Sequence, residues 1–89
     1  MKKIILDLAR MHSVPALHNY LRSVLELPVY YGANLDALHD CLTELGEAVE
    51  LVVPAKVADE AQLGWYGKQF LLVLQDAAVE NDKLTVTLK

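Results

Sequence analysis

The sequence has few of the features that mark secreted, membrane or cofactor-binding proteins. Its single cysteine, Cys41, excludes an internal disulfide and favours a reducing compartment, so we expect a cytoplasmic protein. No apolar run approaches the length of a membrane span, and Asp7 and Arg10 interrupt the basic N-terminal segment too early for a signal peptide. The histidines show no metal-ligand spacing, and there is no glycine-rich phosphate loop. We therefore expect no metal, no cofactor and no enzymatic activity.

Basic residues are absent from a long central segment. Between Glu26 and Glu50 the chain has six carboxylates and no lysine or arginine, although the formal net charge of the whole chain is only −4. A concentrated patch of one sign attracts ligands of the opposite sign. The sequence therefore predicts a basic protein as the partner and argues against nucleic acid or a membrane.

The sequence does contain enough apolar residues for a folded core, with 54% hydrophobic and 22% charged residues. Alternating apolar residues predict strands, and apolar residues at helical spacing predict helices. The segment FLLVL (70–74) fits a buried strand as well, but Phe70, Leu74 and Ala77 keep helical spacing, which favours a helix. The expected elements are strands at 3–9, 48–53 and 83–89, helices at 14–26, 35–45 and 66–80, and a short helix at 55–63.

The order of these elements predicts the topology. The connections between the expected strands, at roughly forty and thirty residues, are long enough for helical crossovers between parallel strands. Thr85 and Thr87 alternate with apolar residues in the last strand, which indicates that helices cover mostly one face of the sheet. We therefore predict one two-layer α/β domain over residues 1–89, in which a three-stranded parallel sheet packs against helices.

A row of acidic residues follows one side of the expected helix at 35–45. Asn34 is a favourable N-cap, and the acids Asp36, Asp40 and Glu44 follow at i, i+4 spacing. Like charges at this spacing repel by ~0.2–0.5 kcal/mol per pair. The helix dipole explains Asp36 equally well, but it disfavours a carboxylate near the C-terminal end, where Glu44 lies. We therefore interpret the three acids together as a surface for an external partner.

Two pairs of adjacent aromatic residues stand at predicted junctions between loops and helices. Tyr30 and Tyr31 precede Gly32, which can adopt a turn that other residues resist. We expect one of these tyrosines to pack under the loop and the other to be an exposed anchor for a partner. Trp65 and Tyr66 are expected to fix the start of the last helix to the core.

The segment LPVYYGANLDALHDCLTE (27–44) resembles the signature of the barstar family, which are intracellular inhibitors of barnase-type ribonucleases. The likeness extends more weakly along the whole chain. It implies a three-stranded parallel sheet packed against helices, a helix at 66–80, and a second helix that plugs a ribonuclease active site with carboxylates in place of RNA phosphates. Asp40 matches the dominant binding aspartate of the family. The candidate partner-binding residues are Tyr30, Tyr31, Asn34, Leu35, Asp36, Ala37, His39, Asp40, Glu44 and Asp76.

Four residues depart from the family's pattern within or beside this segment. His39 and Leu45 stand in place of tryptophans, Glu44 in place of a glycine, and Ala33 in place of an acidic residue. These departures leave open which ribonuclease is bound, and protonation of His39 is expected to weaken binding to a basic partner. The alternative is a non-inhibitory or immunity-type acidic module that binds another basic protein or toxin. We expect the chain to be a monomer.

Overall fold

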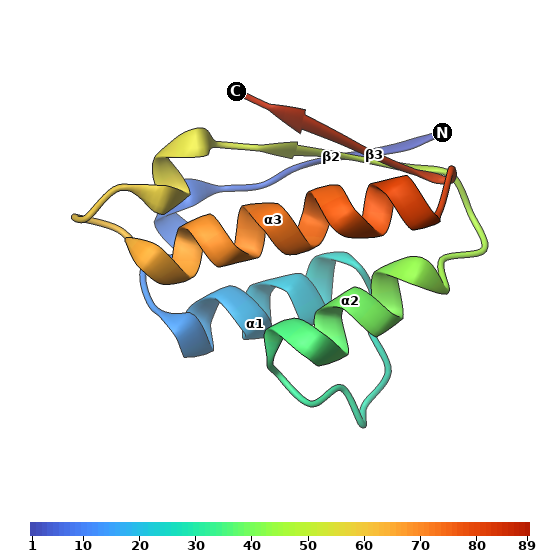
Figure 1. Ribbon diagram of the computed structural model, residues 1–89. Coiled ribbons are helices and arrows are strands. Elements are labelled where there is room, and N and C mark those ends of the chain that lie inside the picture. Colours follow the sequence, from blue (N-terminus) through green and yellow to red (C-terminus); the bar gives the residue numbers. More distant parts are fainter.

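Three strands form one parallel sheet in the computed structural model, which covers residues 1–89. They are β1 (Lys2–Ile5), β2 (Val49–Val53) and β3 (Leu84–Leu88), with β2 in the middle. Lys2 is level with Val49, and Val49 is level with Leu84. The three α-helices all lie on one face of this sheet (Figure 1). The predicted two-layer α/β fold with a three-stranded parallel sheet is therefore confirmed.

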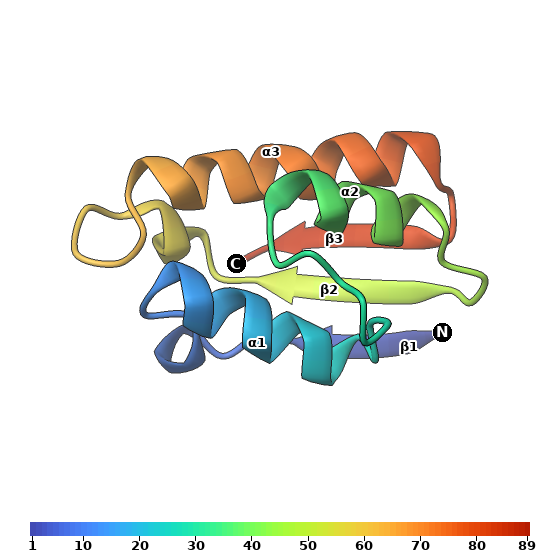
Figure 2. The same cartoon turned by 90° about the horizontal axis from the view of Figure 1, so that it is seen from below.

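The helical layer contains three α-helices, α1 (Val14–Val24), α2 (Leu35–Thr43) and α3 (Trp65–Glu80), and two short 3₁₀-helices, η1 (Leu8–Arg10) and η2 (Ala55–Ala58). α1 lies on the β1 side of the layer, α3 runs along β3, and α2 packs against α3 (Figure 2). The segment at 66–80 is thus a helix, as its spacing indicated. None of the helices combines the length and apolar composition needed to cross a membrane.

Several expected boundaries are wrong, and local hydrogen bonds explain the largest differences. The first strand ends at Ile5 rather than residue 9, because the Asp7 carboxylate accepts a hydrogen bond from the Ala9 N–H at 3.0 Å and so starts η1. The segment 55–63 forms η2 and turns instead of a longer helix. Val57 is its one fully buried residue, so the segment lacks the apolar side that a packed α-helix needs.

The core lies between the sheet and the helices and is one cluster of 16 buried residues. α2 contributes Leu38 and Leu42, each fully buried. Burial of one leucine contributes roughly 1.5–3 kcal/mol, which exceeds the repulsion along the acidic row. The fold can therefore hold α2 in place despite its charges. The largest other fully buried side chains are Met11, Leu17, Leu21, Leu51, Phe70 and Leu74.

The start of α3 is fixed to the core by Tyr66 and Gly67, whereas Trp65 faces solvent. A Cβ atom on Gly67 would lie 2.1 Å from the Val57 carbonyl oxygen, so only glycine lets α3 approach η2 this closely. Tyr66 is half-buried and its hydroxyl bonds to His18. Trp65 is 71% exposed, so the expectation that it anchors the helix to the core is wrong. Residue 65 falls on the side of α3 opposite its buried residues.

Candidate functional site

The N-terminal end of α2 is fixed by the residue expected to cap it. The Asn34 Oδ1 accepts a hydrogen bond from the Ala37 N–H at 2.8 Å, while Leu38 and Leu42 bury the opposite side of the helix. Asp36, Asp40 and Glu44 are all exposed. The chain therefore presents three carboxylates outwards from one side of a capped and packed helix.

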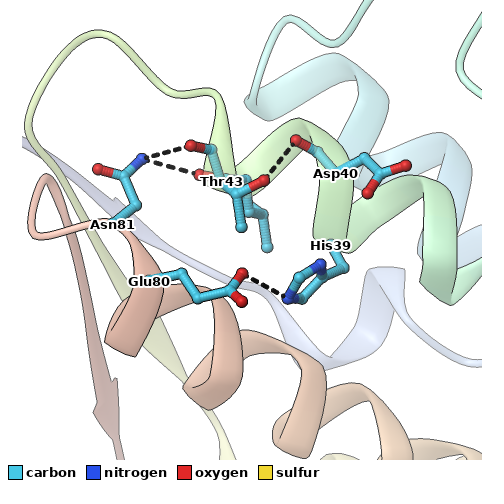
Figure 3. A network of polar contacts seen from close by, with 6 residues as sticks. His39, Asp40, Thr43, Glu80 and Asn81 are labelled. Atoms are coloured by element: carbon cyan, nitrogen blue, oxygen red, sulfur yellow. Dashed lines mark hydrogen bonds and ion pairs between the residues drawn. The ribbon is translucent and has the colours of Figure 1, made fainter.

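The C-terminal end of α2 is held by Asn81, the residue that follows α3. This contact was not predicted from the sequence. Its Nδ2 donates to the carbonyl oxygens of Leu42 at 3.0 Å, Thr43 at 3.4 Å and Leu45 at 3.2 Å (Figure 3). The last carbonyl groups of a helix have no partner within the helix, and α2 has no basic residue in its last turn. One side chain from a distant part of the sequence thus satisfies this end. No local pattern in the sequence signals such a contact.

A second contact between α2 and α3 joins His39 to Glu80. The His39 Nε2 lies 3.1 Å from the Glu80 Oε2, and His39 is half-buried between the helices (Figure 3). Glu80 thereby brings a fourth carboxylate beside the exposed row of α2, and we call Asp36, Asp40, Glu44 and Glu80 the acidic face. A protonated His39 would form an ion pair with Glu80 inside this face. The expected weakening of binding at low pH stays a prediction.

Asp76, the residue expected on the last helix, is exposed on α3 one turn before Glu80. No side-chain hydrogen bond or ion pair joins it to α2, whereas Glu80 forms one with His39. In the sequence, the i, i+4 spacing of Asp76 and Glu80 indicated an acidic pair on this helix. Spacing alone does not show which of the two carboxylates faces α2. Leu35 and Ala37 are half-buried at the start of α2, and Asn34 is exposed.

The two tyrosines before α2 have opposite environments, as predicted. Tyr30 is 84% exposed, whereas Tyr31 is buried. The Tyr31 hydroxyl lies 2.6 Å from the Nδ1 of buried His18, whose Nε2 lies 2.7 Å from the Tyr66 hydroxyl. Burial raises the pKa of Tyr31 and lowers the pKa of His18, so the neutral imidazole donates to one hydroxyl and accepts from the other. Tyr31 supports the loop from inside, and Tyr30 is the tyrosine available to a partner.

The turn into α2 is strained at Ala33 and not at Gly32. Ala33 has a φ of 53°, in the left-handed region that residues with a Cβ atom rarely adopt, whereas the φ of Gly32 lies outside this region. The expectation that Gly32 supplies the unusual turn is therefore wrong. A Cβ atom on Gly32 would lie 3.2 Å from the Asn34 Nδ2, so the glycine instead allows close packing beside the cap.

A cleft of about 500 Å³ separates the loop before α2 from the C-terminal half of this helix. Its lining includes the carboxylates of Glu26, Asp40 and Glu44, the exposed Tyr30, and Cys41. Burial, and then the nearby charges of Glu44 and Asp40, raise the pKa of the Cys41 thiol. The thiol therefore stays protonated near neutral pH and is a poor nucleophile. No group of His, Cys, Asp and Glu side chains is arranged to hold a metal ion.

The six carboxylates counted between Glu26 and Glu50 do not form one patch. The Glu26 Oε2 lies 3.9 Å from the Lys2 Nζ. Glu50 lies on the uncovered face of the sheet, where its Oε2 accepts a hydrogen bond from the Thr87 hydroxyl at 2.9 Å. Glu26 still lines the cleft with Asp40 and Glu44, whereas Glu50 lies apart from them, and the fold adds Glu80 to the acids of α2. The surface is thus smaller than the run of sequence indicated, and it draws on two helices.

Comparisons with known proteins show the family to which the chain belongs. The sequence matches the model of the Barstar family, described as barstar (barnase inhibitor), over residues 1–89. It is also 40% identical over 81 residues to the "Putative ribonuclease inhibitor YrdF" of Bacillus subtilis (strain 168), an alignment that covers 90% of this chain and 89% of that protein. The family is one of inhibitors and not of enzymes. The chain therefore belongs to the Barstar (barnase inhibitor) family.

Proposed function

We propose that the protein inhibits a basic, barnase-type ribonuclease by placing the acidic face in the active site of that enzyme. The family and the name of the relative support ribonuclease inhibition in general. The observation that carries the mechanism is the exposed row of Asp36, Asp40 and Glu44 on a helix held at both ends, by Asn34 and by Asn81. An enzyme that binds RNA phosphates presents cations in its active site, and a fixed row of carboxylates can occupy the same positions.

Each part of the surface has a chemical role in this proposal. Asp40 lies in the middle of the row and lines the cleft, so it meets the cations that otherwise hold a phosphate. Tyr30 supplies an exposed aromatic anchor beside it. Asn34, Leu35 and Ala37 form the rim at the start of α2, and Asp76 and Glu80 extend the contact onto α3. One chain binds one enzyme molecule.

The self-repulsion of the row also fits a binding role. In the free protein, the like charges of Asp36, Asp40 and Glu44 oppose helix formation by ~0.2–0.5 kcal/mol per pair. Cations of the partner would remove this repulsion on binding, and the excess negative charge would speed the encounter. Surfaces built for a partner are commonly unfavourable in the free protein, because the sequence there is selected for the complex.

The direct test measures RNA cleavage by basic microbial ribonucleases, barnase included, in the presence of increasing amounts of the native protein. Native protein should inhibit at least one of these enzymes, and Asp40→Ala should weaken the inhibition by at least about 30-fold, or about 2 kcal/mol. Thermal unfolding of Asp40→Ala should stay unchanged or rise slightly. Glu60→Ala, which removes an exposed carboxylate far from α2 in the sequence, is the matched control and should inhibit like the native protein.

Two outcomes would reject parts of the proposal. If Asp40→Ala unfolds at a much lower temperature but still inhibits, Asp40 is a structural residue and the site is misassigned. If the native protein binds a ribonuclease without reducing its activity, the acidic face belongs instead to a non-inhibitory or immunity-type module for basic proteins. His39 and Glu44, which depart from the family's pattern, lie within this surface and decide which enzyme in the set is bound.

A further inference from the structure

Two adjacent apolar side chains stand at the tip of the loop between α1 and α2. Val29 is 94% exposed, the largest exposed fraction of any large apolar residue in the chain, and Tyr30 is 84% exposed. We call these two residues the apolar tip. The loop projects beyond the helices on the side away from the sheet (Figure 1). Tyr30 already belongs to the proposed binding surface, whereas Val29 serves neither the core nor that surface.

A tight turn places both residues of the apolar tip at its corners. The Tyr31 N–H donates to the Pro28 carbonyl oxygen at 3.0 Å, which closes a four-residue turn with Val29 and Tyr30 at its central positions. Such positions usually hold glycine, proline, asparagine, aspartate or serine, which favour the turn conformation or hydrogen-bond to it. A β-branched valine does neither. Turn formation therefore does not explain why an apolar residue stands at the most exposed place of the loop.

The turn is held from behind by Tyr31 and Arg22. The buried Tyr31 hydroxyl lies 2.6 Å from the His18 Nδ1, and the Arg22 Nη2 donates to the Tyr31 carbonyl oxygen at 3.2 Å. The Arg22 guanidinium also lies 5.9 Å from the centre of the Tyr31 ring. A partner that contacts the apolar tip therefore meets a loop that is already ordered, so binding costs less conformational entropy.

We propose that Val29 is a contact residue for the ribonuclease, and that the apolar tip selects enzymes with an exposed aliphatic or aromatic side chain beside their basic active site. This inference rests on the proposed function and adds an apolar requirement to the requirement for charge. Val29 stands between Pro28 and Tyr30, and both of these residues line the cleft that contains Asp40. A protein that covers this cleft therefore reaches the tip of the loop as well.

The charges beside the apolar tip favour this occupant over others. The carboxylates of Glu26, Asp40 and Glu44 line the neighbouring cleft, and its lining includes no lysine or arginine. A second copy of the chain docked here would bring these like charges together, and an anionic membrane would be repelled in the same way. A basic protein is attracted instead, and an apolar side chain among its cations would complete the fit.

Apolar contact and charge act at different stages of binding. Charges act before contact and raise the association rate, whereas buried apolar area acts only within the complex and slows dissociation. Apolar contacts at the margin of an interface also exclude water from the charged pairs that they surround. Loss of Val29 should therefore shorten the lifetime of the complex without slowing its formation.

The first test measures both rates, by stopped-flow mixing and competition, with the basic microbial ribonuclease that the native protein inhibits best. Val29→Thr, which keeps the β-branched shape, should dissociate about tenfold faster than the native protein and associate at the same rate. Ile5→Thr is the matched control, because it changes an exposed apolar residue on the face of the sheet that the α-helices leave uncovered. This control should bind like the native protein.

A second variant separates contact from simple exposure. Val29→Glu adds a carboxylate beside Tyr30, so a basic enzyme that left residue 29 in solvent should bind this variant as tightly as the native protein or more tightly. An enzyme that covers residue 29 with an apolar side chain should instead bind with a Kd at least about tenfold higher, because the added carboxylate loses water without gaining a partner. Thermal unfolding of both variants should match that of the native protein, because the position is exposed.

The outcomes distinguish this inference from the proposed function. Native dissociation of Val29→Thr, or native or tighter binding by Val29→Glu, would overturn the role of Val29 while leaving inhibition and its dependence on Asp40 intact. If the native protein inhibits none of the ribonucleases, the proposed function is rejected, and the contact proposed for Val29 is rejected with it.

Discussion

α2 and α3 pack against each other, yet they leave opposite kinds of side chain facing solvent. α2 exposes the carboxylates of Asp36, Asp40 and Glu44, whereas α3 exposes the apolar side chains of Trp65, Leu72 and Val79. Charges are recognised at a distance by a partner of opposite sign, while apolar side chains act only on contact. The two neighbouring helices therefore differ in the kind of interaction that their exposed sides can make.

The two helices also differ in what keeps them folded. α3 has 16 residues and begins without a side-chain cap, so its stability comes from its length and from the core residues that it buries. α2 has only nine residues, which is too short to be stable alone, and both of its ends are held by asparagine side chains. α2 thus depends on its surroundings more than α3 does.

Asn81→Ala tests what keeps α2 folded, and we expect it to cause the largest change in stability. The substitution leaves the carbonyl groups of Leu42, Thr43 and Leu45 without their donor, so the free energy of unfolding should fall by roughly 1–3 kcal/mol. Urea unfolding followed by circular dichroism measures this change. Asn19→Ala, at an exposed position in α1, is the matched control. Equal stability of the two variants would show that α2 does not depend on this contact.

A smaller effect should separate the acidic face from the exposed apolar side chains of α3. Because salt screens exposed charges, the rate of association with the inhibited ribonuclease should fall by about tenfold between roughly 0.05 M and 0.5 M salt, with a much smaller change in the dissociation rate. Stopped-flow mixing measures both rates. Glu44→Gln should make the dependence on salt shallower, and Leu72→Gln should leave it unchanged. An association rate that is independent of salt would remove the role of charge in the encounter.

The smallest expected effect concerns the loop that leads into α2. Burial lowers the pKa of His18 in the folded protein, so the unfolded chain binds a proton more readily. The stability due to neutral His18 is therefore complete above the ordinary histidine value of about 6.5 and is lost as the pH falls below it. Unfolding in urea at about pH 7 and about pH 5 measures the loss. His18→Gln should show a smaller loss than the native protein. Equal losses in the two proteins would contradict the assignment.

The sequence was most informative where a contact is local or periodic. Asn34 and Asp36 marked the start of α2, and the spacing of Leu38 and Leu42 marked its buried side. The parallel sheet followed from the lengths of the connections. Contacts between distant segments, such as those of Asn81 with the end of α2 and of Glu80 with His39, could not be predicted because no local pattern encodes them.

The strained backbone of Ala33 and the exposure of Trp65 were also not predicted, because both depend on the three-dimensional surroundings. Gly32 is the residue type that commonly adopts an unusual turn, yet Ala33 has the left-handed conformation, and Gly32 instead packs close to Asn34 and Ala37. Trp65 is the type of residue that usually packs in a core, but its position on α3 turns it outwards. Residue type predicts a preference, and the three-dimensional surroundings decide the outcome.

The hydrogen bonds from Asn81 also link the binding helix to the order in which the chain is made. α2 ends at Thr43, but the side chain that holds this end lies 36 to 39 positions further along the chain. During synthesis from the N-terminus, the ribosome must therefore release residue 81 before α2 acquires its final support. The two ends of the helix are secured at different times, first at Asn34 and later at Asn81. A nascent chain that still lacks its last segment holds all the carboxylates of α2 without the side chain that secures the end of this helix, so under the proposed function it would bind a ribonuclease only when folding is complete.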